Sequence, residues 1–387
     1  MRTMHSVLKH GGLFWDREAA PADACAARFR RMQQAIADNG DDAWLVFGDI
    51  ERHGDLVYVT NFLPRVRSAL TFVPRQGEPL LLANIGLRDV PAAKTMTWVE
   101  EVRPFGRLPK EVISLIEEKG LSSGRVGTCG FDRSLPVAEW EAIDKGLPHV
   151  QWAARDAVMT KLRATKQDWE IAALRHAAEL AHATLASAPA ALRSGRSLRQ
   201  SFADIDRVAR RAGAEDTRFM IAFGDGHFRP IEDRTLAAGD VVTVYLSVEV
   251  QRYWAEVSRT FVLGSAGPAL RDLHAKAEKA LAAMAAAARP GTPAGDIARA
   301  ARTALGDGAL YQSAAVYGVG HGIGLDSQED PVLNEANGNA LVENAVLAMR
   351  LLLRHGGHGV GLSQMVAVKT GGPAMIASPQ PLVEIAH

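Results

Sequence analysis

The sequence has 387 residues, and its 44 lysine and arginine residues balance 44 aspartate and glutamate residues, so the formal net charge is +0. This length allows two domains with sizeable cores, and the balanced charge predicts no nucleic-acid or polyanion partner. Because the chain has only two cysteines, no apolar signal core at its N-terminus and no apolar run of membrane-spanning length, we expect a cytoplasmic protein with no membrane partner.

The first 150 residues alternate short apolar runs with helical patterns. After an irregular arm over residues 1–22, the spacing of apolar residues predicts a helix over 22–39. Short strands are predicted at 43–47, 57–60, 69–74, 79–83, 98–104 and 125–128, and a further helix at 109–120. Strands that alternate with helices predict an α/β domain, and we place its boundary after residue 158. The two predicted domains are therefore residues 1–158 and residues 159–387.

The second domain is predicted to hold helices around a curved antiparallel sheet, which makes it an α+β domain. Helices are predicted at 166–192, 197–213, 268–288 and 293–305, and a loop-rich segment at 222–240. Two strands are predicted at 345–353 and 359–370. The glycine-rich segment between His355 and His358 predicts the hairpin turn that joins them.

We expect residues 239–264 to form the centre of this domain, and they read GDVVTVYLSVEVQRYWAEVSRTFVLG. Two apolar runs, 241–250 and 253–263, flank the polar pair Gln251-Arg252, which is typical of a two-stranded hairpin. Tyr245 and Glu256 lie midway along the two runs, so both side chains can face one cavity. Further along, VGHGIGL surrounds His321 with glycines, whose bare backbone lets a ligand come close.

These motifs resemble those of the "pita-bread" family, which comprises creatinase, aminopeptidase P, prolidase and methionine aminopeptidase. A typical member reads GDVVLIDLGAEYDGYVADITRTFVVG, which aligns with residues 239–264 without a gap, and GHGIGL at 320–325 is similar to the family's histidine motif. The resemblance continues at 161–181, 289–301 and 341–372. It implies an α+β fold, in which a C-terminal pita-bread domain follows a smaller α/β N-terminal domain of the creatinase and aminopeptidase P branch.

Metal-dependent members of that family bind two divalent ions with two Asp on the hairpin, the motif His and two Glu on the last strands. At the aligned positions this chain has, in order, Tyr245, Glu256, His321, Arg350 and Ser363. An arginine at this place puts a permanent positive charge where a cation would bind. We therefore expect neither a catalytic metal nor another cofactor.

Creatinase is the precedent in this family for hydrolysis without metal, and it uses a histidine from the loop before the hairpin. His227, in the segment GDGHFRP, lies near that position. A neutral imidazole takes a proton from water and returns it to a leaving nitrogen. The resemblance thus implies that His227 is the general acid and base, with Glu256, His321 and Tyr245 as further catalytic residues. The alternative is a loop histidine without a role.

Three residues on the second domain are predicted to bind substrate. A buried Arg350 suits bidentate binding of a carboxylate, and the alternative is that it pairs internally with Glu256. Gln328 takes the position of a second family histidine, and Ser363 the position of the last metal ligand. Tyr245 and Gln328 either orient a substrate or only satisfy the pocket.

The loop NFLPRVR of the first domain adds a further prediction. In creatinase, the corresponding loop carries a phenylalanine and an arginine into the active site of a dimer partner. The resemblance implies that Phe62, together with Arg65 or Arg67, binds substrate in a homodimer. The alternative is two solvated arginines on a surface loop.

The leading interpretation is a metal-independent, creatinase-like hydrolase that cleaves an amide or amidino C–N bond. Its substrate would be a small polar molecule that carries a carboxylate. Three alternatives stay open. They are a lyase or isomerase that uses the same pocket, a binding homologue without catalysis, and an Xaa-Pro metallopeptidase.

Overall fold

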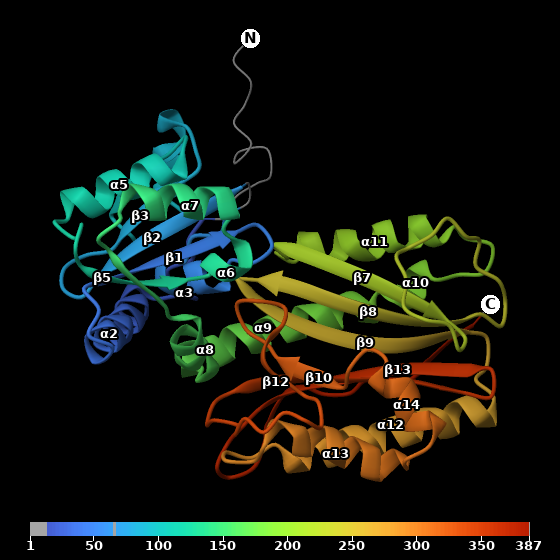
Figure 1. Cartoon of the computed structure of the whole chain (residues 1–387). Helices are drawn as coiled ribbons and strands as arrows, with labels where there is room; N and C mark the ends of the chain where they lie inside the picture. The colour runs from blue at the N-terminus through green and yellow to red at the C-terminus, as the bar shows by residue number, and fades with distance from the viewer. Residues whose placement is uncertain (1–13, 65–66, 387) are drawn as a thin grey trace. The chain divides into compact units, whose positions relative to one another are not determined.

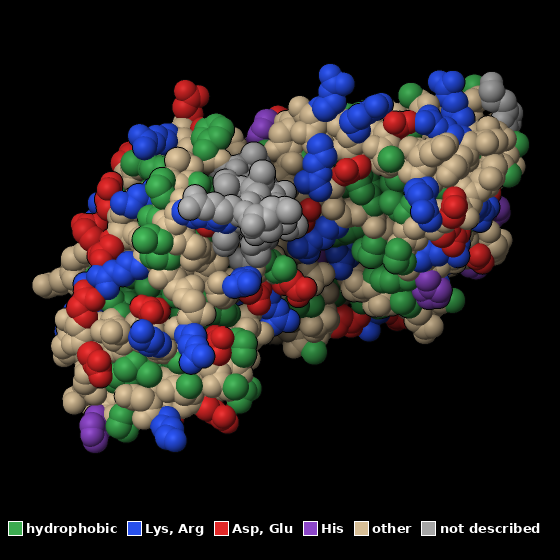
Figure 2. Space-filling view, turned by 90° about the horizontal axis from the view of Figure 1, so that it is seen from above, with side chains coloured by type: hydrophobic (Ala, Val, Ile, Leu, Met, Phe, Trp, Pro, Cys, Tyr) green, Lys and Arg blue, Asp and Glu red, His purple; other side chains and the backbone are tan. Residues whose placement is uncertain are grey.

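The computed structural model describes residues 14–64 and 67–386. The chain divides into two compact units between Arg163 and Ala164. On the face drawn in Figure 2, positively and negatively charged side chains both occur. No helix in the described part of the chain combines the length and apolar character that a membrane crossing needs.

The N-terminal domain is built on one mixed sheet with strand order β4-β3-β2-β1-β5-β6. Its strands are β1 (Ala43–Asp49), β2 (Ser68–Pro74), β3 (Leu80–Ala83), β4 (Glu101–Pro104), β5 (Arg125–Cys129) and β6 (Gln151–Ala154). Its helices include α2 (Ala22–Asp38), α3 (Gly54–Thr60), α4 (Val90–Lys94), α5 (Leu108–Glu118), α6 (Phe131–Ser134), α7 (Val137–Gly146) and α8 (Asp156–Ala164). Helices on both sides of the sheet bury the central strands (Figure 1).

One predicted strand of this domain is wrong, because residues 57–60 belong to helix α3. All seven residues of α3 are buried, and an uninterrupted apolar run does not distinguish a buried strand from a buried helix. Asn61 ends the helix with a left-handed backbone conformation, φ 55°, which is a common helix terminus.

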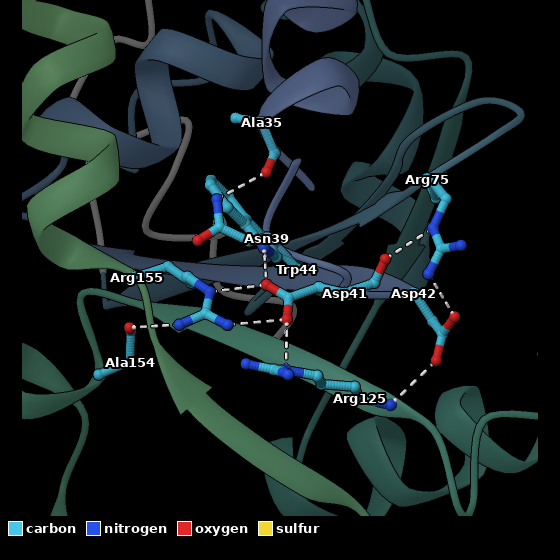
Figure 3. A network of polar contacts seen from close by, with 9 residues as sticks. All are labelled: Ala35, Asn39, Asp41, Asp42, Trp44, Arg75, Arg125, Ala154 and Arg155. Carbon is cyan, nitrogen blue, oxygen red and sulfur yellow. Dashed lines mark hydrogen bonds and ion pairs between the residues drawn. The ribbon is translucent and has the colours of Figure 1, made fainter. Parts of the chain in front are cut away.

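At one end of this sheet, the buried carboxylate of Asp41 binds side chains from several segments of the domain (Figure 3). Asp41 is fully buried and accepts hydrogen bonds from Trp44 Nε1 at 2.7 Å and from Arg155 Nε at 2.6 Å. Arg125 Nε lies 3.0 Å from the other carboxylate oxygen. Since every contact donates to the carboxylate, the buried charge is fully compensated.

The C-terminal domain holds two sheets, with strand orders β15-β9-β8-β7 and β11-β10-β12-β13-β14. The first has strands β7 (Asp216–Phe223), β8 (Val241–Val250), β9 (Tyr253–Leu263) and β15 (Val383–Ile385). The second has strands β10 (Gly320–Gly322), β11 (Glu329–Val332), β12 (Val346–His355), β13 (His358–Ala367) and β14 (Ala374–Ala377). Strands β9 and β13 join the sheets, because Ser258 N–H donates to Ser363 Oγ at 2.6 Å.

Helices α12 and α13 cover the outer side of the β12–β13 sheet (Figure 1). The helices of this domain are α9 (Asp168–Ala186), α10 (Ala188–Ala191), α11 (Leu198–Arg211), α12 (Pro268–Ala287), α13 (Ala294–Leu305) and α14 (Ala309–Ala315). Small buried residues such as Ala280 and Ala298 allow α12 and α13 to pack closely. A reciprocal capping box between Gln167 and Glu170 begins α9.

Both predicted hairpins are confirmed. Strands β8 and β9 pair in antiparallel register around Gln251 and Arg252, which have φ values of 53° and 71°. Two consecutive positive φ angles match the twist of a two-residue hairpin turn. The same holds for β12 and β13, which turn at Gly356 and Gly357. The sequence did not reveal β7, because this strand is half exposed and begins with polar residues.

Candidate active site

The two hairpins and β10 bring four of the predicted site residues into one cluster. Tyr245 lies on β8 and Glu256 on β9, and the register pairs each with a serine, Ser258 and Ser247 respectively. Tyr245 and Glu256 therefore face the same side of the sheet. The Tyr245 hydroxyl donates to Glu256 Oε2 at 2.7 Å. The two side chains thus point toward each other, and their roles in catalysis stay predictions.

Arg350 closes the cluster from strand β12. Its Nη1 donates to Glu256 Oε2 at 3.1 Å and lies 2.9 Å from His321 Nε2. Its Nη2 donates to the Tyr317 carbonyl oxygen at 3.2 Å. Glu256 is fully buried and Arg350 is 15% exposed. The internal pairing of Arg350 with Glu256, which the sequence left as an alternative, is present.

His321 is held by its glycine neighbours. Gly320 has φ 150°, and a Cβ atom there would lie 2.3 Å from the Ala348 carbonyl oxygen, so only glycine fits. His321 Nδ1 lies 2.8 Å from the Gly322 carbonyl oxygen. A carbonyl only accepts, so Nδ1 carries the hydrogen and Nε2 accepts from Arg350. This neutral tautomer satisfies both contacts.

Burial and charge act in opposite directions on Glu256. Burial is the largest single influence and would raise the pKa of its carboxyl group, but Arg350, His321 and the Tyr245 hydroxyl together outweigh burial and lower the pKa to about 2. Burial and the neighbouring Glu256 charge raise the pKa of the Tyr245 phenol well above its ordinary value. At neutral pH, Glu256 is therefore an ionised acceptor and Tyr245 a neutral donor.

A second group of polar side chains lies next to this cluster and contains His227. His227 is exposed on the loop after β7, with Nδ1 at 3.0 Å from the Tyr317 hydroxyl and Nε2 at 2.7 Å from Arg354 Nη1. Tyr317 thus links both groups, through its hydroxyl to His227 and through its carbonyl to Arg350. Phe228 packs its ring edge-on against Tyr317 and Tyr245.

Sequence reasoning missed Tyr317 and Arg354. Tyr317 precedes the glycine-rich histidine segment by only a few residues, and an aromatic hydroxyl at that place was an available signal. Arg354 follows Arg350 by four residues on β12, so the period of two puts both on the same face. The pairing of Arg354 with a loop histidine depends on tertiary structure and left no local pattern.

Ser363 and Gln328 are the other predicted substrate-binding residues of this domain. Ser363 is buried, faces Arg350 in the β12–β13 register and accepts the Ser258 N–H bond described above. Gln328 is exposed beside Glu329, which forms an ion pair with Lys166 at 2.8 Å. Their roles toward a substrate stay predictions.

The predicted substrate loop belongs to the N-terminal domain. Phe62 is 3% exposed and packs into a hydrophobic cluster of that domain. Arg67 Nη1 donates to Asn84 Oδ1 at 3.0 Å, while Arg65 lies outside the described residues. Substrate binding by these three residues stays a prediction.

Comparison with known proteins places the chain in a family. Residues 172–370 match the model of metallopeptidase family M24. The chain belongs to family M24. Residues 28–165 match the creatinase/prolidase N-terminal domain, so the predicted two-domain fold is confirmed for this M24 protein.

The chain is also similar, at low identity, to proteins that are named as dipeptidases or aminopeptidases. The chain is 23% identical to an Xaa-Pro dipeptidase of Pyrococcus horikoshii, over 65% of this chain and 72% of the relative. It is 26% identical to the putative dipeptidase YkvY of Bacillus subtilis, over 82% and 88%. The structure resembles that of an X-Pro aminopeptidase from Thermotoga maritima with a TM-score of 0.83 and 19% identity, over 93% of this chain and 99% of that one. At such identity the structural likeness shows the fold.

At the centre of this M24 domain, an arginine lies against the two side chains that could act as metal ligands. Within 14–64 and 67–386, no three His, Cys, Asp or Glu side chains cluster closely enough to hold a metal. Glu256 Oε2 and His321 Nε2 lie 3.4 Å apart, and Arg350 Nη1 contacts both. The guanidinium thus occupies the coordination directions of the two remaining donors.

Proposed function

We propose that this M24 protein hydrolyses an amide C–N bond in a small, carboxylate-bearing substrate of about dipeptide size, without a catalytic metal pair. Membership in a metallopeptidase family and the dipeptidase names of its relatives support the hydrolytic reaction and the substrate size. One observation carries the rest of the proposal, namely that Arg350 donates to both Glu256 and His321.

Electrostatics argues against a dication at that place. Two unit charges about 4 Å apart repel by about 4 kcal/mol at an effective dielectric of about 20, and a dication about doubles that energy. Arg350 cannot relieve the repulsion by losing its proton. In addition, Glu256 already neutralises Arg350, so no carboxylate of this cluster is left to attract a metal.

His227 supplies the acid and base chemistry in this proposal. Its Nδ1 is held by the Tyr317 hydroxyl, which orients the ring, and Nε2, which contacts Arg354 in this structure, is the nitrogen that transfers the proton. Nε2 removes a proton from water while the water oxygen bonds to the amide carbon. The proton then passes to the amide nitrogen as the C–N bond breaks, which yields a carboxylic acid and an amine. Glu256 is a poor candidate for this base, because its pKa of about 2 makes it a weak proton acceptor.

An Xaa-Pro metallopeptidase is the second candidate, and the comparisons favour it over a creatinase-like reaction. The Pyrococcus relative is named an Xaa-Pro dipeptidase, and no named relative cited above is a creatinase. The donor set around Arg350 weighs against the metal, whereas the relatives' names weigh toward proline dipeptides as substrates. Both candidates predict cleavage of an amide bond, so the metal requirement separates them.

The decisive experiment measures metal content and hydrolysis together. Protein loaded with Mn, Co and Zn and then desalted should contain far less than one metal per chain by mass spectrometry. Hydrolysis of a panel of Xaa-Pro dipeptides should survive a chelator, and water labelled with oxygen-18 should enter the acid product. Stoichiometric metal with chelator-sensitive hydrolysis would establish the metallopeptidase instead. Turnover without label from water would indicate a lyase or isomerase, and binding without turnover a non-catalytic homologue.

An arginine variant sharpens this test. Arg350→Glu places a carboxylate beside Glu256 and His321, so metal uptake should rise above that of the wild type. Arg299→Glu, a change of the same charge on α13, is the control that should leave metal uptake unchanged. The predicted homodimer is also a proposal, and light scattering of the purified protein checks it.

A further inference from the structure

Two arginines on one face of β12 have opposite charge environments. Arg350 contacts the Glu256 carboxylate, as described above. Arg354 has no carboxylate within ion-pair distance among the residues that the structure describes, and its guanidinium contacts only the imidazole of His227 there. Its Nε is buried and has no hydrogen-bond partner within the same residues. A half-buried cation that lacks a counter-charge is costly, which favours a role in binding an anion.

The contact between Arg354 and His227 also determines the state of the histidine. Arg354 can only donate, so His227 Nε2 must accept and Nδ1 must carry the hydrogen. Nδ1 then donates to the Tyr317 hydroxyl oxygen, which also accepts the Phe228 N–H at 2.9 Å. The imidazole is therefore neutral, and the one lone pair that could accept a proton, on Nε2, is already engaged by Arg354.

Arg350 is less suited than Arg354 to bind a carboxylate. Both of its terminal nitrogens already donate within the cluster. A second carboxylate there would also lie next to the ionised Glu256, and like charges at short distance repel. This argues against the sequence-based assignment of carboxylate binding to Arg350.

We propose that Arg354 binds the carboxylate of the substrate and that this binding releases His227 Nε2 to act as the base. The carboxylate replaces the imidazole as the acceptor for Nη1 and also accepts from Nη2, which gives the end-on bidentate geometry that guanidinium groups prefer. His227 is exposed, so a carboxylate can reach the pair from solvent. The inference rests on the proposed function, because only a reaction that needs a base gives the release a purpose.

In this scheme, the substrate completes the site. Without a carboxylate, Arg354 keeps the base inactive, and water alone cannot be activated. When a carboxylate binds, its negative charge compensates the positive charge of the Arg354 guanidinium, which then turns away from the His227 ring. An analogue in which an amide replaces the carboxylate cannot neutralise Arg354, so it should both bind more weakly and react more slowly.

Nitrogen NMR of the histidine side chains tests the first step with acetate as the probe and acetamide as its neutral match. Of the 12 histidines, the signal missing from a His227→Gln spectrum identifies His227. Acetate should shift the His227 nitrogen signals of the wild type, and acetamide should not. Arg354→Met should weaken the acetate response by about tenfold or more, since charge-assisted hydrogen bonds are lost. An unchanged response in Arg354→Met, or its loss in Arg350→Met alone, would overturn the inference.

Matched controls separate this inference from folding and from the proposed function. Arg229→Met removes an exposed arginine from the same loop, paired with Glu232, and should keep the acetate response. Arg354→Lys keeps the charge but not the bidentate geometry, so it should recover only part. The ratio of kcat/KM for Gly-Pro over Gly-Pro amide should fall about tenfold or more in Arg354→Met. Hydrolysis with an unchanged ratio would refute the inference but keep the function, whereas Arg354-dependent acetate binding without any hydrolysis would refute the function alone.

Discussion

Each domain contains a fully buried carboxylate that pairs with arginine, and the two differ in their other neighbours. Asp41 accepts from Arg155, Arg125 and the Trp44 ring, and all of these are permanent donors (Figure 3). Glu256 accepts from Arg350 and from the Tyr245 hydroxyl. Arg350 therefore compensates the charge of Glu256 in the same way as Arg155 and Arg125 compensate that of Asp41.

The surroundings of Glu256 have a chemistry that those of Asp41 lack. Arg350 also contacts His321 and the backbone of Tyr317, whose hydroxyl reaches His227. The imidazoles of His321 and His227 and the hydroxyl of Tyr317 can accept or donate protons. The arginine and tryptophan side chains around Asp41 do not do so under ordinary conditions. A buried ion pair by itself is weak evidence for function. The titratable groups next to it make the second one a candidate site.

The largest effect is expected for Arg350→Met. This change leaves Glu256 buried without a cation, so the free energy of unfolding should fall by about 3–5 kcal/mol. Adding Glu256→Gln removes the uncompensated charge, and the double variant should recover most of the loss. Urea denaturation of wild type, single and double variants measures the recovery. If the double variant were less stable than the single one, Glu256 would not be the partner that needs Arg350.

The next largest effect is expected in the way the contribution of Glu256 to stability changes with pH. Its folded-state pKa of about 2 lies below the ordinary value of 4.5. The stabilisation is therefore complete above pH 4.5 and is lost as the pH falls toward 2. The difference corresponds to about 3 kcal/mol at neutral pH.

Denaturation of wild type and Glu256→Gln between pH 7 and pH 3 measures this contribution. The gap in unfolding free energy between the two proteins should be constant at pH 5 to 7 and narrow below pH 4.5. Parallel curves over the whole range would mean that Glu256 is not held ionised by Arg350.

A smaller loss is expected for Asp41→Asn. Arg155 is 13% exposed and Arg125 48% exposed, so both can turn partly toward water when the carboxylate is removed. We expect about 2 kcal/mol of destabilisation of the N-terminal domain. Asp42→Asn is the matched control, because its carboxylate is 40% exposed. Equal losses in both variants would show that burial of Asp41 is not the source of the effect.

Local patterns predicted most of the fold. The alternation of the two runs around Gln251-Arg252 was enough for the β8–β9 hairpin, since burial and strand period act within a few residues. Helix α3 failed because its seven residues are all buried, which removes the periodicity that tells helix from strand. Strand β7 failed for the opposite reason, because its exposed polar residues hide the pattern.

The candidate site was predictable only where motif and position coincide. The hairpin and the glycine-flanked histidine pointed to Glu256, Tyr245 and His321. The internal contact of Arg350 with Glu256 was left open, because sequence alone does not fix which of two partners a buried arginine meets. Arg354 and Tyr317 meet His227 through the packing of β12, the segment after α14 and the loop after β7. Such contacts between distant segments leave no mark on the local sequence.

The smallest effect is expected for an ion pair with the same shifted pKa but full access to solvent. Hydrogen bonding from Arg103 lowers the pKa of Glu118 to about 2, as low as that of Glu256. Glu118 is 47% exposed, and its bidentate contact lies at the surface of the N-terminal domain. Water and salt screen exposed charges, and the free side chains pay entropy to pair. Glu118→Gln should therefore leave the urea midpoint unchanged, with or without added salt. A clear salt-dependent loss would show that surface pairing matters here, and the contrast with Glu256 would then not depend on burial.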